Sequence, residues 1–261
     1  LNRFVNDDPA NKKIYEEINE IKFKNKLRAL PLIKQYSGID ANPESIFDTQ
    51  IKRLHAYKRQ LLNLFHIISL YHGIKNGTIK DFYPHTYIFG AKAAPSYIYA
   101  KKIIELILAV SKTIDQDPDV NNLIKIAFIE NYDVSKAEVL IPASDVSEQI
   151  SLAGKEASGT SNRKLRRNGA LTLGTRDGAN IEISKLVGSN NIFTFGRNEE
   201  QVKEIKLANS YNPWDRYHTN GKIKEVRDSL INGTFSSDKG QFQRIYDEIR
   251  YHNDEFRVLK D

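Results

Sequence analysis

Apolar positions along the chain follow two periods that alternate with each other. Over residues 10–36, isoleucines and leucines recur at near-helical spacing among lysines, glutamates and asparagines, which predicts an amphipathic helix that ends at Ser37-Gly38. The same period predicts helices over 56–71, 95–113, 179–187, 198–209, 222–232 and 241–251. Two further helices are expected to start at 147–149 and near Ser158.

Short apolar runs separate these helices. They predict strands over 46–54, 86–90, 124–129, 138–142, 171–173 and 192–195. Strands of a parallel sheet read as continuous apolar runs because helices cover both of its faces. The sequence therefore predicts an α/β fold: a Rossmann-like parallel sheet with helices on both faces, whose ligands bind at the carboxyl ends of the strands.

Composition narrows the class of protein. The 261 residues are 40% hydrophobic and 28% charged, as in globular proteins, and their net charge of +6 comes from lysines spread along the chain, which favours a solvated surface with a preference for phosphate-bearing ligands over a nucleic-acid tract. No apolar run approaches the ~18–20 residues of a membrane span and no signal peptide opens the chain, so we expect a cytoplasmic protein.

Missing residue types exclude some chemistry. There is no cysteine, which rules out disulfides, thiolate nucleophiles and cysteine metal sites, and the six histidines lack metal-ligand spacing, so no metal is expected. Methionine is absent as well and the chain begins with Leu1, which suggests a piece of a longer protein or an altered chain.

The loop that leads into the helix near Ser158 concentrates candidate chemistry. Gly159 would let a phosphate approach the backbone, Thr160 offers a hydroxyl, and the first turn of a helix attracts anions. Lys164 follows within one turn on the same side. An ordinary N-cap explains the loop equally simply, and Lys164 is open to three interpretations: a Schiff-base lysine, a phosphate contact or a solvated surface lysine.

Other loops hold weaker signals. Residues 52–59 place four cations and His55 at a strand end, where Arg53 could grip an oxyanion and Lys58 could act as a point charge, although such a run is usually a solvated face. Tyr132 follows a predicted strand and could touch a ligand or close the core. The loops at 90–95 and 174–180 could equally be tight turns.

Taken together, these loops closely resemble the α-glucan phosphorylases, the family of glycogen, starch and maltodextrin phosphorylases. The resemblance runs in order through 47–63 (FDTQIKRLHAYKRQLLN), 90–97 (GAKAAPSY), 131–132 (NY), 140–151 (LIPASDVSEQIS) and the motif at 156–180. It covers nearly the whole chain.

The resemblance implies roles for individual residues. Lys164 would hold pyridoxal 5′-phosphate as a Schiff base, with the cofactor phosphate bound by Lys52, Thr160 and the backbone at Ser161 and the pocket lined by Tyr132. Substrate phosphate would be bound by Arg53 and Lys58, and the glucosyl unit by Glu156, Ser158 and Gly159, with His55 beside them. Arg53, Lys58 and Lys164 would form the catalytic set.

The implied activity is the reversible, retaining phosphorolysis of a terminal α-1,4-linked glucose to glucose 1-phosphate. The implied partners are an α-glucan and inorganic phosphate, with a homodimeric parent, no nucleic acid and no membrane. Residues 1–261 would be a single C-terminal, cofactor-bearing domain of a two-domain (GT-B type) glycosyltransferase, with residues 1–40 as a leading helix, and without the family's N-terminal half and last helices. The alternative is an inactive fragment that keeps the fold and binds phosphate ligands or partners only.

Two features depart from the family pattern. Arginines stand where the family usually has apolar residues, at Arg163, Arg166, Arg167 and Arg176. Burying even one unpaired guanidinium group costs several kcal/mol, so four of them in a core-facing helix and the loop after the next strand should be disruptive unless they reach solvent or anions. Asp133 stands where some relatives carry an arginine beside the cofactor phosphate, which a carboxylate would repel.

Overall fold

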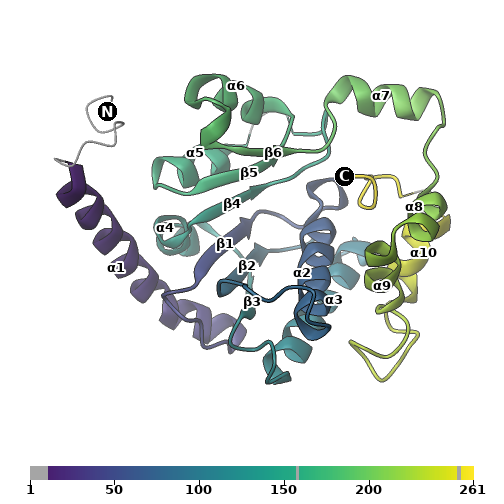
Figure 1. The fold of residues 1–261 in the computed structure, drawn as a ribbon, viewed down its shortest axis with the longest axis horizontal. Coiled ribbons are helices and arrows are strands. Elements are labelled where there is room, and N and C mark those ends of the chain that lie inside the picture. Colours follow the sequence, from purple (N-terminus) through teal and green to yellow (C-terminus); the bar gives the residue numbers. More distant parts are fainter. Residues whose placement is uncertain (1–10, 157–158, 252–253) are drawn as a thin grey trace.

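The computed structural model of the protein describes residues 11–156, 159–251 and 254–261. Within these residues, six parallel strands form one sheet in the order β3-β2-β1-β4-β5-β6 (Figure 1). The strands are β1 (Ile46–Ile51), β2 (His85–Ala91), β3 (Ile124–Glu130), β4 (Val146–Gln149), β5 (Leu171–Thr175) and β6 (Phe193–Phe195). The predicted α/β class with a parallel sheet is confirmed.

Helices connect the strands and follow the last one. They are α1 (Lys12–Ser37), α2 (Gln60–Lys75), α3 (Ile98–Gln116), α4 (Val134–Ala143), α5 (Thr160–Arg167), α6 (Gly178–Val187), α7 (Glu199–Leu207), α8 (Pro213–Thr219), α9 (Gly221–Asp228) and α10 (Gln243–Tyr251), with the short 3₁₀ helices η3 (Ala56–Lys58) and η4 (Ser189–Asn191). In Figure 1, α1 runs along one side of the sheet and α8, α9 and α10 gather at the other.

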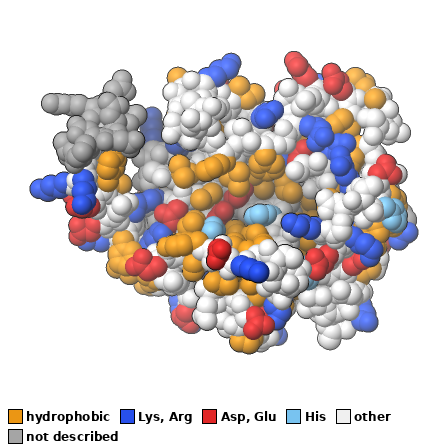
Figure 2. Space-filling model, in the orientation of Figure 1, with side chains coloured by type: hydrophobic (Ala, Val, Ile, Leu, Met, Phe, Trp, Pro, Cys, Tyr) orange, Lys and Arg blue, Asp and Glu red, His pale blue; other side chains and the backbone are white. Residues whose placement is uncertain are grey.

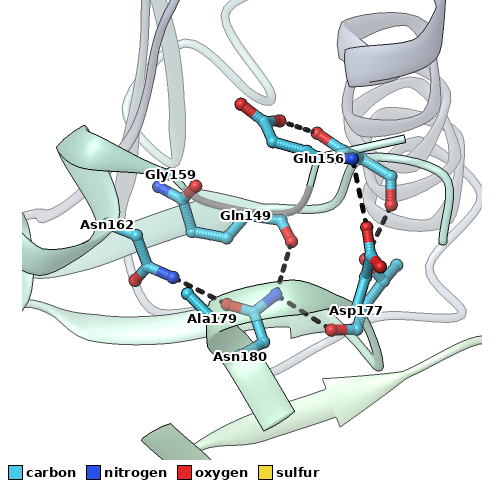
Figure 3. A pocket seen from close by; sticks show the side chains of 9 residues that line it. Gln149, Glu156, Gly159, Asn162, Asp177, Ala179 and Asn180 are labelled. Atoms are coloured by element: carbon cyan, nitrogen blue, oxygen red, sulfur yellow. Dashed lines mark hydrogen bonds between the residues drawn. The ribbon is translucent and has the colours of Figure 1, made fainter. Parts of the chain in front are cut away.

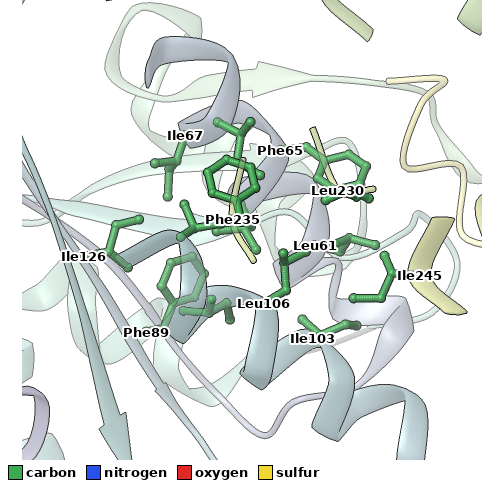
Figure 4. Close-up of a cluster of buried hydrophobic side chains, with 14 of the residues drawn as sticks. Leu61, Phe65, Ile67, Phe89, Ile103, Leu106, Ile126, Leu230, Phe235 and Ile245 are labelled. Carbon is green, nitrogen blue, oxygen red and sulfur yellow. The ribbon is translucent and has the colours of Figure 1, made fainter. Parts of the chain in front are cut away.

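Two apolar clusters sandwich the sheet, and alternate residues of β2 feed them. Phe89 enters the larger cluster, in which side chains of α2, α3 and the C-terminal helices pack together, including Leu61, Leu106 and Ile245 (Figure 4). Ile88, the residue before Phe89, enters the smaller cluster with residues of α1, α4 and α5. Helices therefore bury both faces of the sheet, as the continuous apolar strands predict.

The strand order fixes where a ligand can bind. From the central strand β1, the chain adds β2 and β3 on one side and then crosses to add β4, β5 and β6 on the other. The connections diverge between β1 and β4, and a crevice opens at the carboxyl ends of strands at such a switch point. The segments after β1 and β4, which start at Lys52 and Ile150, lie at this point.

Several predicted boundaries shift by a few residues. The helix predicted over 10–36 is α1, and it ends at Gly38, whose φ of 73° a glycine adopts without strain. The strand predicted over 46–54 ends at Ile51. The helix predicted over 56–71 is broken at Arg59, whose φ of 56° separates the 3₁₀ turn η3 from α2.

Two predictions of element type were wrong. Residues 138–142, predicted as a strand, lie inside α4, whose N-cap Asp133 accepts a hydrogen bond from the Lys136 amide. Residues 147–149, predicted as a helix start, belong to β4. The apolar run 138–142 is short enough to fit a buried helix as well as a strand. The polar side chains at 147–149 have partners that are distant in sequence, so from the sequence alone they resemble the polar start of a helix. Helix α8, around Trp214, was not predicted.

The four arginines of the 163–176 segment reach solvent, so the condition under which they would not be disruptive is met. Arg163, Arg167 and Arg176 are exposed, and half-buried Arg166 donates to the carbonyl of Asn191 at 3.0 Å. Helix α5 instead buries Asn162 and Leu165. The cations therefore do not disrupt the core of this domain.

Among the described residues, no helix combines the length and apolarity needed to cross a membrane.

Candidate active site

The site is built from loops that follow β1, β4 and β5 at the switch point. Lys52 comes directly after β1 and is buried, with 8% of its surface exposed. Its Nζ donates to Oε1 of Gln149, the last residue of β4, at 3.0 Å and lies 3.6 Å from Oε2 of Glu156. Burial lowers the pKa of Lys52, and the charge of Glu156 opposes that fall.

Glu156 is the point at which two lysines meet. Lys58, in the 3₁₀ turn after β1, places its Nζ 2.6 Å from Oε1 of Glu156, and the hydroxyl of Ser151 donates to Oε2. Burial alone would raise the pKa of Glu156, but the charge of Lys52 and the hydrogen bonds from Lys58 and Ser151 outweigh it and lower the pKa. The carboxylate is therefore ionised at neutral pH and balances both cations.

A carboxylate from the next strand holds the Glu156 loop in place. Asp177, just after β5, accepts from the backbone amides of Gly154 at 2.9 Å and Glu156 at 3.3 Å. Beside it, Asn162 donates to Oδ1 of Asn180, whose own amide donates to the carbonyl of Gln149 at 3.1 Å (Figure 3). These side chains line a narrow pocket that also includes Gly159. The pocket thus has a rigid polar floor.

Helix α5 begins at the edge of this pocket. Its N-cap is Gly159, which offers no side-chain hydrogen bond. The amide of Asn162 donates to the carbonyl of Gly159 at 3.1 Å, and among the described residues the amides of Thr160 and Ser161 have no acceptor. Thr160 and Lys164 are four residues apart and share one face of the helix, while half-buried Ser161 lies beside Thr160. The Lys164 side chain is exposed and its amine has no hydrogen-bond or ion-pair partner among the described residues. Ser158 lies outside the described residues.

The remaining predicted residues lie on the same edge of the sheet. Tyr132 follows β3 and approaches Gly90 of β2, whose carbonyl accepts from the Lys52 amide at 2.9 Å. Burial raises the pKa of Tyr132 to about 12, so its hydroxyl stays protonated. Arg53 and His55 are exposed on the loop after β1, and the His55 ring lies 4.7 Å from that of Tyr57. Partial burial and then the charge of Lys58 lower the pKa of His55, which favours its neutral form.

Asp133 takes a structural role. Its carboxylate caps α4 and also pairs with Lys136 at 3.0 Å. The positive charge of Lys136 offsets the negative charge of Asp133, which would otherwise repel a phosphate.

Sequence reasoning assigned no role to Gln149, Ser151 or Asp177. Gln149 belongs to the segment 147–149 that was interpreted as a helix start, which hid its place at the end of β4, and Ser151 follows two residues later. Asp177 lies in a loop that was predicted as either a tight turn or a ligand contact, and it instead binds the Glu156 loop. Polar residues at the end of a buried strand, or within two residues of it, are the signal that could have found them.

No cluster of histidine, aspartate or glutamate side chains that could hold a metal ion occurs in the part of the chain that the structure describes.

Comparison with known proteins places this site in a family. The carbohydrate phosphorylase family matches residues 1–261. The chain is 52% identical to the glycogen phosphorylase of Bacillus subtilis (strain 168) over 97% of its length, and 42% identical to the liver form of glycogen phosphorylase of Ovis aries over 100%. It spans 32% and 30% of the length of these two relatives, respectively. The chain therefore belongs to the carbohydrate phosphorylase family.

Proposed function

We propose that the chain is the cofactor-bearing, C-terminal domain of an α-glucan phosphorylase, with residues 1–40 leading into it. The parent protein would catalyse the reversible phosphorolysis of a terminal α-1,4-linked glucose. In this reaction a phosphate oxygen bonds to C1 of the glucose, the C1–O bond to the glucan breaks, and a proton goes to the leaving oxygen. The products are glucose 1-phosphate and a glucan one glucose shorter.

One observation carries this proposal: Lys52 and Lys58, from a loop after β1, meet Glu156 beside the first turn of α5. Cations fixed next to the first turn of a helix would bind phosphate groups and stabilise the charge that develops during transfer. The carboxylate of Glu156 would accept hydrogen bonds from sugar hydroxyls. Phosphate and sugar binding are thus possible within one pocket.

The residues present fit pyridoxal 5′-phosphate. The amine of Lys164 is exposed and unpaired among the described residues, one turn from the uncapped first turn of α5. Lys164 would hold the group covalently, Lys52, Thr160 and the backbone at Ser161 would bind its phosphate, and Tyr132 would line its pocket. When bound, the group would supply a phosphate that assists proton transfer to the substrate phosphate.

The chain's own residues would do the rest. Arg53 and Lys58 would bind the substrate phosphate, Arg53 through its planar fork and Lys58 as a point charge. Glu156, Ser158 and Gly159 would contact the glucosyl unit, with His55 beside it. For Lys58 to bind phosphate, its ion pair with Glu156 at 2.6 Å must open or be shared. Phosphate and Glu156 would therefore compete for the same ammonium group.

A catalytically inactive chain is the second candidate, because the chain spans about 30% of the length of its relatives. In that case the fold and phosphate binding persist and turnover needs the rest of the parent. We include in the proposal a cytoplasmic, homodimeric parent.

A chimera tests the proposed activity. The chain replaces the matching segment of the Bacillus subtilis relative, and glucose 1-phosphate formation from glycogen and phosphate is measured. We expect activity that depends on added pyridoxal 5′-phosphate and is lost in K164A. A folded chimera that stays inactive with the cofactor, while the unmodified relative is active, contradicts the proposal that these residues support the reaction.

A further inference from the structure

Arg59 follows Lys58 directly and is held in an unusual way. Its φ of 56° lies in the left-handed region, which costs a non-glycine residue free energy that the surrounding structure must offset. Its side chain is completely buried, with an exposed fraction of 0%. The residue after Lys58 is therefore constrained in both its backbone and its side chain, and of its guanidinium nitrogens only Nη2 has no hydrogen-bond partner among the described residues.

Two hydrogen bonds fix the Arg59 guanidinium. Nε donates to the carbonyl of Ile150, just after β4, at 2.7 Å, and Nη1 donates to Oδ2 of Asp261 at 2.6 Å. Burial lowers the pKa of Arg59, and the charge of Asp261 opposes that fall. Because an unpaired buried charge is costly, Asp261 is the counter-ion on which this arrangement depends.

Asp261 is itself seated by a second arginine. The other oxygen of Asp261, Oδ1, lies 3.1 Å from Nη1 of Arg197, which follows β6. The side chain of Asp261 is 3% exposed. At Gly196, with a φ of 74°, an added Cβ would come within 3.0 Å of the Asp261 carboxylate. The fold leaves just enough room for this carboxylate between the two arginines.

The network reaches the lysine that the proposed function assigns to phosphate. The carbonyl of Lys58 accepts from Nε2 of Gln50 at 3.2 Å, and the carbonyl of Tyr57 accepts from the Leu152 amide at 2.9 Å. These bonds and the Arg59 contacts tie the 3₁₀ turn to β1, to the segment after β4 and to Asp261. No other described side chain replaces Asp261 as the counter-ion of Arg59 within ion-pair distance.

We propose that Arg59, Asp261 and Arg197 form a positioning network that holds Lys58 against Glu156 and in place for phosphate. The three residues touch no reacting atom in this scheme; they act through the backbone of the turn. The inference rests on the proposed function for the role of Lys58, whereas the anchoring of the turn stands on the contacts alone.

The test is a titration of the ¹⁵N-labelled chain with inorganic phosphate, followed by NMR at the Lys58 Nζ and the amides of residues 55–59. D261N keeps the size of the side chain and removes its charge. We expect phosphate affinity to fall about tenfold and hydrogen exchange of the 55–59 amides to quicken, with the amides of β1 and β2 unchanged. Charge alone predicts the opposite, since removing a carboxylate makes the chain more cationic.

Three further variants make the outcome decisive. K58A tests the proposed function separately, because unchanged phosphate affinity in K58A would overturn the phosphate role of Lys58. Hydrogen exchange of the 55–59 amides in D261N would then still test whether the network anchors the turn. R197Q, which keeps the Arg59 to Asp261 contact, should weaken phosphate binding by roughly threefold and remains informative if D261N does not fold. D40N removes an exposed surface carboxylate, 83% exposed, and should change neither readout. Wild-type affinity and exchange in folded D261N and R197Q overturn the proposal.

Discussion

At the scale of single residues, Glu156 decides how charge is distributed in the site. Its negative charge offsets the positive charges of Lys52 and Lys58, which would otherwise repel each other and any third cation nearby. The family resemblance placed Glu156, Lys52 and Lys58 in one site, but it did not predict that the carboxylate pairs with both lysines. Those pairs join loops that lie about a hundred residues apart in sequence, which local patterns do not report.

Replacing Glu156 should therefore strengthen phosphate binding. In E156Q both lysines lose their counter-ion, and inorganic phosphate should bind roughly threefold to tenfold more tightly. Burial lowers the pKa of Lys58, but its contacts with Glu156 raise it, and on balance the pKa lies above its ordinary value. In E156Q the pKa of Lys58 should therefore fall. NMR titrations of the Lys58 Nζ against phosphate and against pH measure both effects, with D40N as the control for a lost surface charge. Weaker phosphate binding in E156Q would contradict this account of the site.

A second residue-scale prediction concerns two carboxyl groups beneath the site. Asp48 on β1 and Glu148 on the neighbouring β4 are both buried and share a hydrogen bond. Burial raises the pKa of Asp48 to about 7, and burial together with the charge of Asp48 raises the pKa of Glu148 well above its usual range. The folded chain therefore holds protons that the unfolded chain releases near its ordinary pKa of about 4.

Stability should consequently fall as pH rises from about 4 through about 7, because the native state binds more protons than the unfolded state. E148Q removes one of the two titrating groups at constant size. Relative to wild type, E148Q should therefore become more stable as the pH is raised from about 5 to about 8. Urea unfolding of both proteins at the two pH values measures the difference in unfolding free energy. A difference in unfolding free energy that is the same at both values would mean that the pair does not titrate in this way.

At the scale of elements, the sequence predicts a long periodic segment more securely than a short one. Helix α1 matches its apolar pattern closely because its 26 residues are long enough for the period to show, and the short apolar runs of β2 and β3 are strands as predicted. The segments 138–142 and 147–149 were assigned the wrong type because so short a stretch fits a helix as well as a strand. Helix α5 was predicted from its loop chemistry, and its arginine-rich face fits because Leu165, its one apolar residue, is buried.

Helix α5 yields a stability prediction. Leu165 is 1% exposed and packs in the smaller apolar cluster, so L165A should lower the free energy of unfolding by about 2–4 kcal/mol through lost contacts and a cavity. The matched variant R163A removes an exposed side chain two residues earlier in the same helix and should change the free energy of unfolding by no more than about 0.5 kcal/mol. Urea unfolding compares the two. An R163A variant as unstable as L165A would mean that the arginine face is buried in solution.

At the scale of the whole molecule, the strand order turns separate loops into one site. The order β3-β2-β1-β4-β5-β6 brings the segments after β1, β4 and β5 together at the switch point, where Lys52, Glu156 and Asp177 lie. The sequence predicted the parallel sheet, and the candidate site residues lie at the edge where it leads us to expect ligands. It did not predict the supporting contacts of Asp177 or Asp261, because both join segments that are distant along the chain.

On the face shown in Figure 2, lysine and arginine side chains lie scattered among acidic and neutral ones instead of forming one continuous tract. The proposed cofactor phosphate at the start of α5 would be a discrete phosphate-bearing ligand, and Lys164 is the residue that would make its attachment specific.

The central claim is that Lys164 carries pyridoxal 5′-phosphate, and reductive trapping tests it most directly. The chain is incubated with the cofactor, reduced with borohydride, digested and mapped by mass spectrometry, with K164A treated in parallel. We predict one dominant adduct at Lys164 that is absent from K164A. No adduct at Lys164, or a spread over exposed lysines that K164A leaves unchanged, would contradict the account.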